Sequence, residues 1–416
     1  MWIKHLFARV LWVAITVTTA GPTLGQWSLI PLPGDHPEVF AMVTHTNSEL
    51  FIGTGGLPNS TNAIGILRSD DHGGTVTAQN NGLMDTRFDR LFRSLISIDK
   101  SLVAASADGT YFSDNGGQSW EKRANGLPVI DRTSMRSANA LVSLGGEIFC
   151  GTPEGVYKTV DQGKHWINSS TGLSNPDVRA LTKLDKFLFA STDGDGIYRS
   201  SDGGASWTRS GKGIPDTVHS RAIIADDGVI LAGTTMGTYR SLDQGETWTT
   251  TLPNATARSF AAGNGLLAIG AFRGGLVYIS QDRGEQWTDV SGNLPGGMGV
   301  WAMAFDDQFL YAAVARQGLW RISLSELESL GKKQATDTAS TPATAGLPQG
   351  PPGRPGNMLR QNLLSFDSNG DGKLTREEIP LRMQRILSQA DANKDDALDS
   401  EEIAKFFQQI RPGRPK

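Results

Sequence analysis

The sequence predicts an all-β seven-bladed propeller over residues 26–325, followed by a small all-α domain near the C-terminus. Two observations predict the propeller. A short motif, Ser/Thr-x-Asp-x-Gly-x-x-Trp, recurs down the chain, and its Trp positions stand roughly 39 to 46 residues apart, which is the period of one blade. An apolar strand of the form Leu-Phe-Ala-Gly-Thr recurs with it. Each repeat is therefore a unit that must pack on its neighbours to bury its apolar faces.

Four copies of the motif are complete, and they span Thr159–Trp166, Ser200–Trp207, Ser241–Trp248 and Ser280–Trp287. Two further copies are altered: Asn115 replaces the Asp in one, and Val76 replaces the Trp in the other. In such a turn the Asp accepts backbone N–H bonds, and the Gly adopts a positive φ at no steric cost. The pattern resembles the Asp-box (BNR) repeat of the sialidase-like β-propeller superfamily, and the resemblance covers about residues 26–325.

Seven apolar strands define the number of blades. They are Leu50–Thr54, Leu102–Ser106, Ile148–Thr152, Leu188–Thr192, Ile230–Thr234, Leu267–Ala271 and Leu310–Val314. The seventh repeat ends at Ser323 and lacks its Asp-box, whereas the segment Gly25–Asp35 is similar to the segment that follows each Asp-box. We therefore expect the N-terminal strand around Trp27 to complete the last blade and so close the ring.

The N-terminus has the pattern of an export signal. Lys4, His5 and Arg9 precede a short apolar run, Val10–Ala20. This pattern predicts a signal peptide at residues 1–25 and a secreted, periplasmic or cell-surface protein. The apolar run is too short to span a bilayer comfortably, so no integral membrane span is expected after cleavage. The formal net charge of −4 argues against nucleic-acid binding by bulk charge. We also expect the protein to be a monomer.

Residues 326–356 are rich in Pro, Gly and Thr and predict a flexible linker. Beyond it, residues 357–411 contain two acidic loops flanked by apolar residues at helical spacing. The first loop, residues 367–378, matches the calcium loop of the EF-hand family. Its expected ligands are Asp367, Asn369, Asp371, the Lys373 carbonyl, Thr375 and Glu378. Leu374 stands where paired loops of this kind form a short β contact.

The second loop, residues 391–402, follows the same pattern with one departure. Its expected ligands are Asp391, Asn393, Asp395, the Ala397 carbonyl, Asp399 and Glu402. Asp396 replaces the Gly of the family, and a non-glycine residue adopts the required backbone conformation at some cost. The sequence therefore predicts an EF-hand pair that binds two Ca²⁺ ions as cofactors, the second more weakly.

Five arginines recur at steps of about 37 to 43 residues, close to the blade period. They are Arg93, Arg136, Arg179, Arg221 and Arg258. Resemblance to other propellers implies that they lie where the innermost strands start, near the mouth of the central channel. Guanidinium groups gathered there suit an anionic ligand or a partner that bears carboxylates. The photosystem II assembly factor family, also a seven-bladed Asp-box propeller, carries an arginine patch of this kind. Alternatively, each Arg packs on the next blade and pairs with a local acid.

The resemblance to sialidases would imply a Tyr nucleophile, but five of the six Tyr residues occupy one repeated position, which indicates packing. No pair of carboxylates of the kind used by glycosidases stands out. The sequence thus predicts an exported, calcium-binding, non-catalytic propeller that binds or scaffolds a protein or a surface polysaccharide. Two alternatives remain open. One is a carbohydrate-active hydrolase with a calcium-binding tail, and the other is an assembly factor similar to the photosystem II family.

Overall fold

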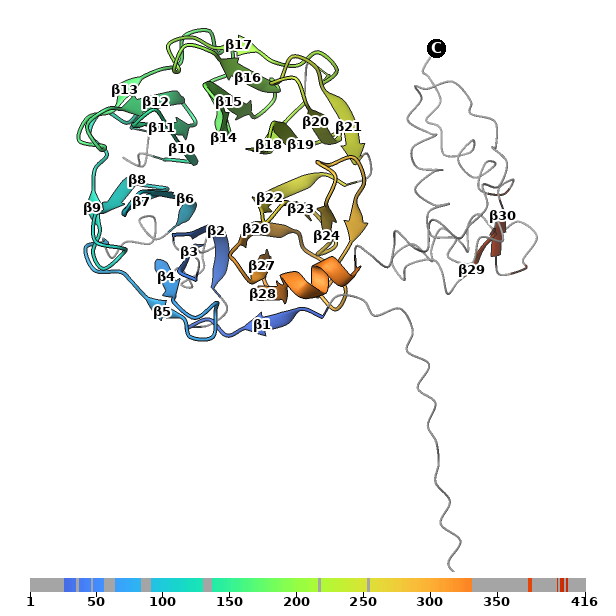
Figure 1. The fold of residues 1–416 in the computed structure, drawn as a ribbon. Coiled ribbons are helices and arrows are strands. Elements are labelled where there is room, and N and C mark those ends of the chain that lie inside the picture. The colour runs from blue at the N-terminus through green and yellow to red at the C-terminus, as the bar shows by residue number, and fades with distance from the viewer. Residues whose placement is uncertain are drawn as a thin grey trace, which may run out of the picture. The chain divides into compact units, whose positions relative to one another are not determined.

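The computed structural model describes residues 26–34, 37–45, 48–55, 64–83, 91–129, 137–215, 218–252, 255–330, 373–375, 395, 397–399 and 402. The chain divides into two compact units between Thr341 and Pro342. In the first unit, the strands form seven four-stranded sheets arranged as the blades of a ring (Figure 1). The predicted seven-bladed all-β propeller is therefore confirmed. The predicted signal peptide and residues 331–356 of the predicted linker lie outside the described residues.

Within each blade the strands are antiparallel and, in blades 1 to 6, run in chain order from the ring axis outward. Blade 1 contains β2 (Glu38–Thr44), β3 (Leu50–Gly55), β4 (Ile66–Ser69) and β5 (Thr77–Ala78). Blade 2 contains β6 (Phe92–Ile98), β7 (Ser101–Ser106), β8 (Gly109–Ser113) and β9 (Glu121–Lys122). Blade 3 contains β10 (Ala140–Leu144), β11 (Glu147–Thr152), β12 (Gly155–Thr159) and β13 (Ile167–Asn168).

The remaining blades repeat this plan. Blade 4 contains β14 (Val178–Leu184), β15 (Phe187–Thr192), β16 (Ile197–Ser200) and β17 (Thr208–Arg209). Blade 5 contains β18 (Ser220–Asp226), β19 (Val229–Thr234), β20 (Gly237–Ser241) and β21 (Thr249–Leu252). Blade 6 contains β22 (Ala257–Gly263), β23 (Leu266–Ala271), β24 (Val277–Ser280) and β25 (Thr288–Asp289). Blade 7 contains β26 (Val300–Phe305), β27 (Phe309–Val314), β28 (Gly318–Ser323) and, outermost, β1 (Ser28–Ile30).

The second strand of each blade is an almost continuous apolar run because a neighbouring blade covers each of its faces. All six residues of β15 are buried, whereas both residues of the outermost strand β17 are exposed. Hydrophobic clusters lie between successive blades: Phe189 of blade 4, for example, packs with Ile230 and Trp248 of blade 5. The core is therefore a series of layers between blades, as expected when each repeat buries its faces only against its neighbours.

The N-terminal strand closes the ring, as the incomplete seventh repeat predicts. β1 pairs antiparallel with β28, with Leu29 opposite Trp320. Trp27 is 3% exposed, and its indole N–H donates to the Val290 carbonyl of blade 6 at 2.7 Å. Trp27 therefore takes the role of the Asp-box Trp that blade 7 lacks.

Residues 324–330, immediately after β28, form a helix. Leu327 is fully buried in the core of blade 7, and Leu324 and Leu330 pack against the same cluster. The sequence places the end of the propeller at residue 325, whereas the packed structure continues to residue 330. The three leucines repeat every three residues, which places them on one face of the helix.

In the second unit, β29 (Lys373–Thr375) pairs antiparallel with β30 (Ala397–Asp399). Leu374, at the position where the sequence predicts a β contact between the two loops, lies opposite Leu398. The helices expected around these loops lie outside the described residues, apart from Glu402, which is helical. The described part of this unit thus consists mainly of a two-stranded contact between the two predicted loops.

Candidate functional site

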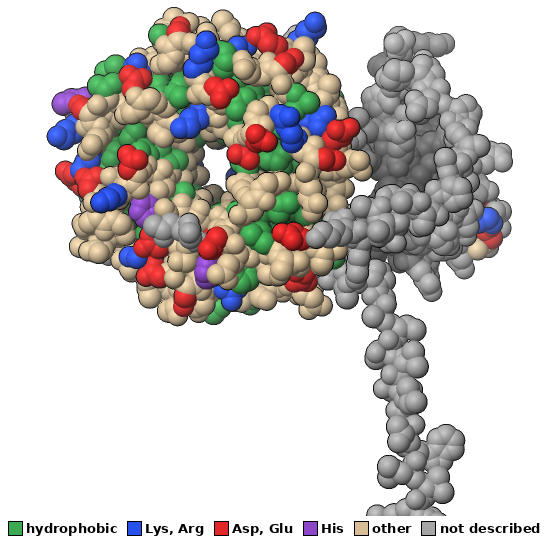
Figure 2. All heavy atoms as spheres, viewed as in Figure 1, with side chains coloured by type: hydrophobic (Ala, Val, Ile, Leu, Met, Phe, Trp, Pro, Cys, Tyr) green, Lys and Arg blue, Asp and Glu red, His purple; other side chains and the backbone are tan. Residues whose placement is uncertain are grey.

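A pocket of about 240 Å³ lies at the ring axis, where the innermost strands of all seven blades meet. Figure 2 shows an opening at the centre of the ring. Each innermost strand contacts the next around the whole ring, including β2 with β26. Each blade contributes one equivalent side chain to the pocket: Phe40, Arg93, Asn139, Arg179, Arg221, Arg258 and Trp301, in blade order. We call these seven positions the mouth ring.

A β-bulge sets the mouth-ring side chain apart in six of the seven blades. In blade 5, Ser220 pairs with Thr234 and Ala222 pairs with Gly233, so Arg221 between them has no partner in the ladder. The same register shift occurs at the mouth-ring position of blades 1, 2, 4, 6 and 7. A bulge re-aims a side chain locally while the rest of the strand stays paired. The fold thus gathers one side chain per blade at a single place.

Arg93 is held by neutral groups of blade 3. Its Nη1 donates to the Ser137 hydroxyl at 2.6 Å and to the Asn139 Oδ1 at 2.8 Å. Asn139 also donates from Nδ2 to the Val178 carbonyl at 2.9 Å, so its amide is fixed between blades 2 and 4. Desolvation, together with the charge of Arg179, lowers the pKa of Arg93. The charge of Arg93 is therefore positioned by hydrogen bonds and not cancelled by a direct ion pair among the described residues.

Arg179 is the mouth-ring cation with direct carboxylate partners. Its Nη2 lies 2.5 Å from Asp177 Oδ2 and 2.8 Å from Asp193 Oδ2. His219 also contacts Asp193, with Nδ1 at 2.5 Å from Oδ1. Burial raises the pKa of Asp177, whereas hydrogen bonding to His219 and the charge of Arg179 outweigh burial and lower the pKa of Asp193. Among the described residues, Arg179 is thus the one mouth-ring arginine that has ion-pair partners.

Arg221 and Arg258 have no direct hydrogen bond or ion pair within the described residues, which include the innermost strands of all blades. The charge of Arg221 nevertheless helps to lower the pKa of Asp193. Desolvation lowers the pKa of Arg258, and the neighbouring charges of Arg221 and Arg179 lower it further. Like charges gathered at one place repel each other, and an anion bound between them relieves this repulsion. These two arginines are the part of the mouth ring best prepared to take an anionic group.

The opposite part of the mouth ring is aromatic. Phe40 of blade 1 and Trp301 of blade 7 stack with ring centroids 4.8 Å apart and an interplanar angle of 23°. Both side chains line the same pocket as the arginines. The mouth therefore combines a cationic arc over blades 4 to 6 with an apolar, aromatic arc over blades 7 and 1.

The structure brings together four of the five arginines that the sequence singles out, namely Arg93, Arg179, Arg221 and Arg258. Arg136 lies outside the described residues, and Asn139 takes the mouth-ring position of blade 3. A search for recurring Arg misses Asn139 and Phe40, because neither residue is cationic. The signal that finds them is the position itself, two residues before a large apolar residue of each innermost strand, as in Phe40 before Met42 and Asn139 before Leu141.

The predicted calcium loops are described only in part. Among the expected ligands, Asp367, Asn369, Asp371, Glu378, Asp391 and Asn393 lie outside the described residues. Asp395 Oδ1 accepts the Ala397 N–H at 3.1 Å, and its Oδ2 lies 3.4 Å from Lys373 Nζ. Glu402 is buried, with 6% exposure. Thr375 and Asp399 lie in β29 and β30, and their backbones take part in the pairing of these two strands.

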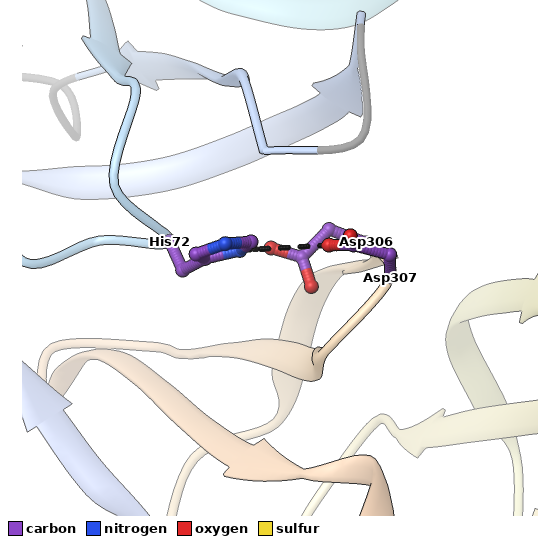
Figure 3. A group of neighbouring side chains, drawn as sticks. All are labelled: His72, Asp306 and Asp307. Atoms are coloured by element: carbon purple, nitrogen blue, oxygen red, sulfur yellow. Dashed lines mark hydrogen bonds and ion pairs between the residues drawn. The ribbon is translucent and has the colours of Figure 1, made fainter.

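A His-carboxylate group joins blade 1 to blade 7 (Figure 3). His72 Nδ1 lies 2.7 Å from Asp306 Oδ2 and 3.7 Å from Asp307 Oδ1. Asp306 is fully engaged: Oδ2 also accepts the Tyr311 hydroxyl, and Oδ1 accepts two backbone N–H groups, of Gln308 and Phe309. We therefore interpret this group as a hydrogen-bonded junction between the first Asp-box turn and the turn between β26 and β27.

Two family models match parts of the chain. The BNR/Asp-box repeat matches residues 111–122, and the DUF6242 beta propeller domain matches residues 132–262. No curated protein sequence matches the chain. The family matches and the seven-bladed fold together identify a β-propeller built from Asp-box repeats. Among the described residues, no helix has both the length and the apolar character needed to cross a bilayer.

Several solved structures share the fold. The extracellular domain of a one component system from B. thetaiotaomicron is 14% identical over 71% of this chain and 40% of its own length, with a TM-score of 0.56. YCF48 from Cyanidioschyzon merolae is 15% identical over 72% of this chain and 99% of its own, with a TM-score of 0.52. A structure of YCF48 bound to D1 peptide is 19% identical over 71% and 96%, also with a TM-score of 0.52.

A GH74 xyloglucanase from Xanthomonas campestris is 15% identical over 73% of this chain and 54% of its own, with a TM-score of 0.56. The chain therefore spans 40% of the extracellular domain and about half of the xyloglucanase. At these identities the likeness establishes the propeller fold and nothing about the ligand.

Proposed function

We propose that this protein is an exported, non-catalytic, calcium-binding propeller whose mouth ring binds a carboxylate-bearing segment of a partner protein. The observation that carries the proposal is the placement of Arg221 and Arg258. Both line the central pocket, and neither has an ion pair or a hydrogen bond within the described residues. Guanidinium groups bind carboxylates through two parallel, charge-assisted hydrogen bonds, so an acidic group of a partner supplies what these side chains lack.

The charges around the pocket favour binding over hydrolysis. Asp177 and Asp193 both contact the same nitrogen of Arg179, so these two carboxylates are engaged in an ion-pair network. A glycosidase needs two carboxylates that flank the bond to be cleaved. Four arginines and two aromatic side chains line the pocket instead. Binding without catalysis is therefore the function that this arrangement supports best.

A peptide is a suitable ligand for this fold, because the similar propeller YCF48 has been solved in complex with D1 peptide. An acidic surface polysaccharide is the second candidate. Phe40 and Trp301 favour it, because aromatic side chains beside arginines suit a ligand with an apolar face and an anionic group. Export is supported by the signal pattern at residues 1–25 and by similarity to extracellular domains.

Calcium binding is proposed for the second unit. Asp367, Asn369, Asp371, Glu378 and their counterparts in the second loop would hold the ions. Three observations support this. The two loops pair at Leu374 and Leu398, Asp395 Oδ1 accepts the Ala397 N–H, and Glu402 is buried at the closing position of its loop. A bidentate Glu at that position is the usual last ligand of such a loop.

The mouth-ring proposal is tested with the full chain and the double variant Arg221→Gln, Arg258→Gln. The matched control is Arg68→Gln, Arg123→Gln, which removes two charges outside the mouth ring. We expect fluorescein-labelled poly-glutamate to bind the wild type and the control. The double variant should bind at least about tenfold more weakly, because two charge-assisted contacts are lost. Binding should also weaken as salt rises. Equal binding by both variants would remove the mouth ring from the function.

Calcium binding is tested by calorimetric titration of the full chain, with Asp367→Asn and Asp391→Asn as single-loop variants. The expected result is two ions for the wild type and one for each variant, with affinities within about 10⁻⁴–10⁻³ M being sufficient outside the cell. Asp396→Gly should strengthen the second site, because Gly adopts a positive φ without steric cost. No heat of binding at millimolar calcium would refute this part of the proposal.

A further inference from the structure

A groove leaves the mouth ring between blades 5 and 6. Its inner part, about 190 Å³, is lined by Arg221 and Arg258 of the mouth ring and extends to Thr235, Thr256 and Phe272. Its outer part, about 350 Å³, shares these last three residues and continues to Leu276. The central pocket, the inner part and the outer part thus form one continuous series, because each shares lining residues with the next.

The chemical character changes along this groove. Its inner end carries the two guanidinium groups that lack ion-pair partners in the described structure. Farther out, the lining includes Ala255, Ala271, Leu276 and Phe272, and Phe272 is 38% exposed despite its apolar ring. Arg273 stands at the outer part as the one charged side chain among its described lining residues. A pocket with an apolar lining and a few converging polar groups is typical of a ligand site.

Two further apolar side chains are exposed close to this groove. Met236 follows Thr235 in the turn between β19 and β20 and is 51% exposed, and Met298 forms a β-bridge with Arg273 and is 41% exposed. Exposed apolar residues gathered beside a concave surface mark interaction sites, whereas scattered ones do not. The flexible methionine side chains suit a surface that adapts to a bound side chain.

We propose that this groove binds the C-terminal residue of a partner chain, with its carboxylate between Arg221 and Arg258 and a large apolar side chain against Phe272. The proposal rests on the proposed function and names the partner segment for the same site. The two arginines line both the polar central pocket and the apolar groove. The ligand must therefore carry its carboxylate and its apolar group next to each other, as a terminal residue does on a single Cα.

The groove also offers groups for the end of a peptide backbone. Thr235 and Thr256 line both parts of the groove, and their side-chain hydroxyls make no hydrogen bond among the described residues. A hydroxyl donates and accepts, so it suits the last N–H or the preceding carbonyl of a bound chain. Capture of a terminal carboxylate is an established mode of peptide recognition that combines affinity with selectivity for the final residue.

The test uses the full chain and an array of peptides attached through their N-termini. The last position is varied over all twenty residues, and each peptide is made with a free carboxylate and as an amide. We expect free acids that end in Leu, Ile, Met or Phe to bind at least about tenfold better than those that end in Gly or Ala. Amidation should remove this binding by a similar factor. Phe272→Ala should abolish the preference for apolar ends, whereas the control Leu242→Ala, at an exposed Asp-box position of blade 5, should not.

The outcomes separate this inference from the proposed function. If poly-glutamate binding depends on Arg221 and Arg258 but the array shows no preference for apolar ends, or the amides bind equally well, the groove inference fails alone. If neither the array nor poly-glutamate binds, both fail. Displacement by dodecanoate without any preference in the array would assign the groove to a lipid and would overturn the peptide proposal.

Discussion

Each Asp-box turn that keeps its Asp is held by one carboxylate that accepts several hydrogen bonds. In blade 4, Asp202 accepts the Ser206 hydroxyl at 2.6 Å, the Ser206 N–H at 2.9 Å and the Ser200 hydroxyl at 2.8 Å. These bonds favour the charged form, and they lower the pKa of Asp202 to about 2. The turn is thus stabilised by a carboxylate that must remain ionised.

The lowered pKa of Asp202 predicts how the stability of the propeller depends on pH. Because the folded pKa of Asp202 lies below the value of about 3.9 expected for an unfolded chain, its contribution is present above pH 4 and is lost as the pH falls towards 2. As the pH is lowered from 4 to 2, the melting temperature of Asp202→Asn should therefore fall less than that of the wild type. Asn115→Asp, which restores the carboxylate to the second Asp-box, should lose more. Thermal melts across this pH range measure both, and parallel curves for all three proteins would contradict the assignment.

At the scale of the blade, glycines set how closely neighbouring blades approach. Gly82, Gly126, Gly172 and Gly213 all have positive φ, and a Cβ at any of them would overlap the carbonyl oxygen of the Asp-box Trp in the next blade. In blades 1 to 4 the chain after the Asp-box thus lies directly against the backbone of the following blade. Residues with a side chain cannot occupy this position without moving one blade away from the other.

Gly172→Ala should therefore destabilise the propeller by roughly 2–5 kcal/mol, combining roughly 1–2 kcal/mol for the left-handed backbone and roughly 1–3 kcal/mol for overpacking. Gly203→Ala is the matched control. Gly203 also has a positive φ, at 67°, but no atom lies within 4 Å of the added Cβ. Its substitution should cost only the backbone term. Urea denaturation of both variants measures the difference, and equal losses would mean that the Trp207 carbonyl does not restrain the junction.

The sequence predicts the blades well because each blade is a local pattern of short strands and an Asp-box. It predicts the mouth ring in part, because four of its seven members are arginines that recur with the period. A search for recurring Arg does not find Phe40 and Asn139, whose equivalence needs the repeats to be aligned on their apolar residues. The bulge that gathers these side chains is a local change in strand pairing that the residue types do not indicate. The groove at Phe272 depends on how two blades meet. The calcium ligands remain a prediction from the sequence.

At the scale of the whole molecule, one short strand joins the two ends of the ring. Besides the pairing of β1 with β28, the backbone of Trp27 exchanges hydrogen bonds with the Asn293 side chain, at 2.6 Å and 2.9 Å. Trp27 belongs to the cluster between blades 6 and 7. The stability of the complete ring therefore depends on a residue near the start of its chain.

Trp27→Ala should destabilise the propeller by roughly 3–5 kcal/mol, the usual cost of removing a buried Trp. Trp27→Phe keeps an aromatic ring but loses the hydrogen bond to Val290, and should cost clearly less. Chemical denaturation followed by circular dichroism compares the two variants with the wild type. A Trp27→Ala protein as stable as the wild type would show that the last blade closes without this side chain.

The mouth ring has a consequence for how such a site can change over time. Each blade contributes one residue to it, and in blade order these are Phe, Arg, Asn, Arg, Arg, Arg and Trp. Where a bulge is present, the mouth-ring residue is not paired with the neighbouring strand. Its substitution therefore leaves the paired residues on either side intact. In the six blades that have the bulge, the ligand preference can therefore change by single substitutions that keep the strand pairing. Proteins that share this architecture are free to diverge in what they recognise while their repeats stay alike.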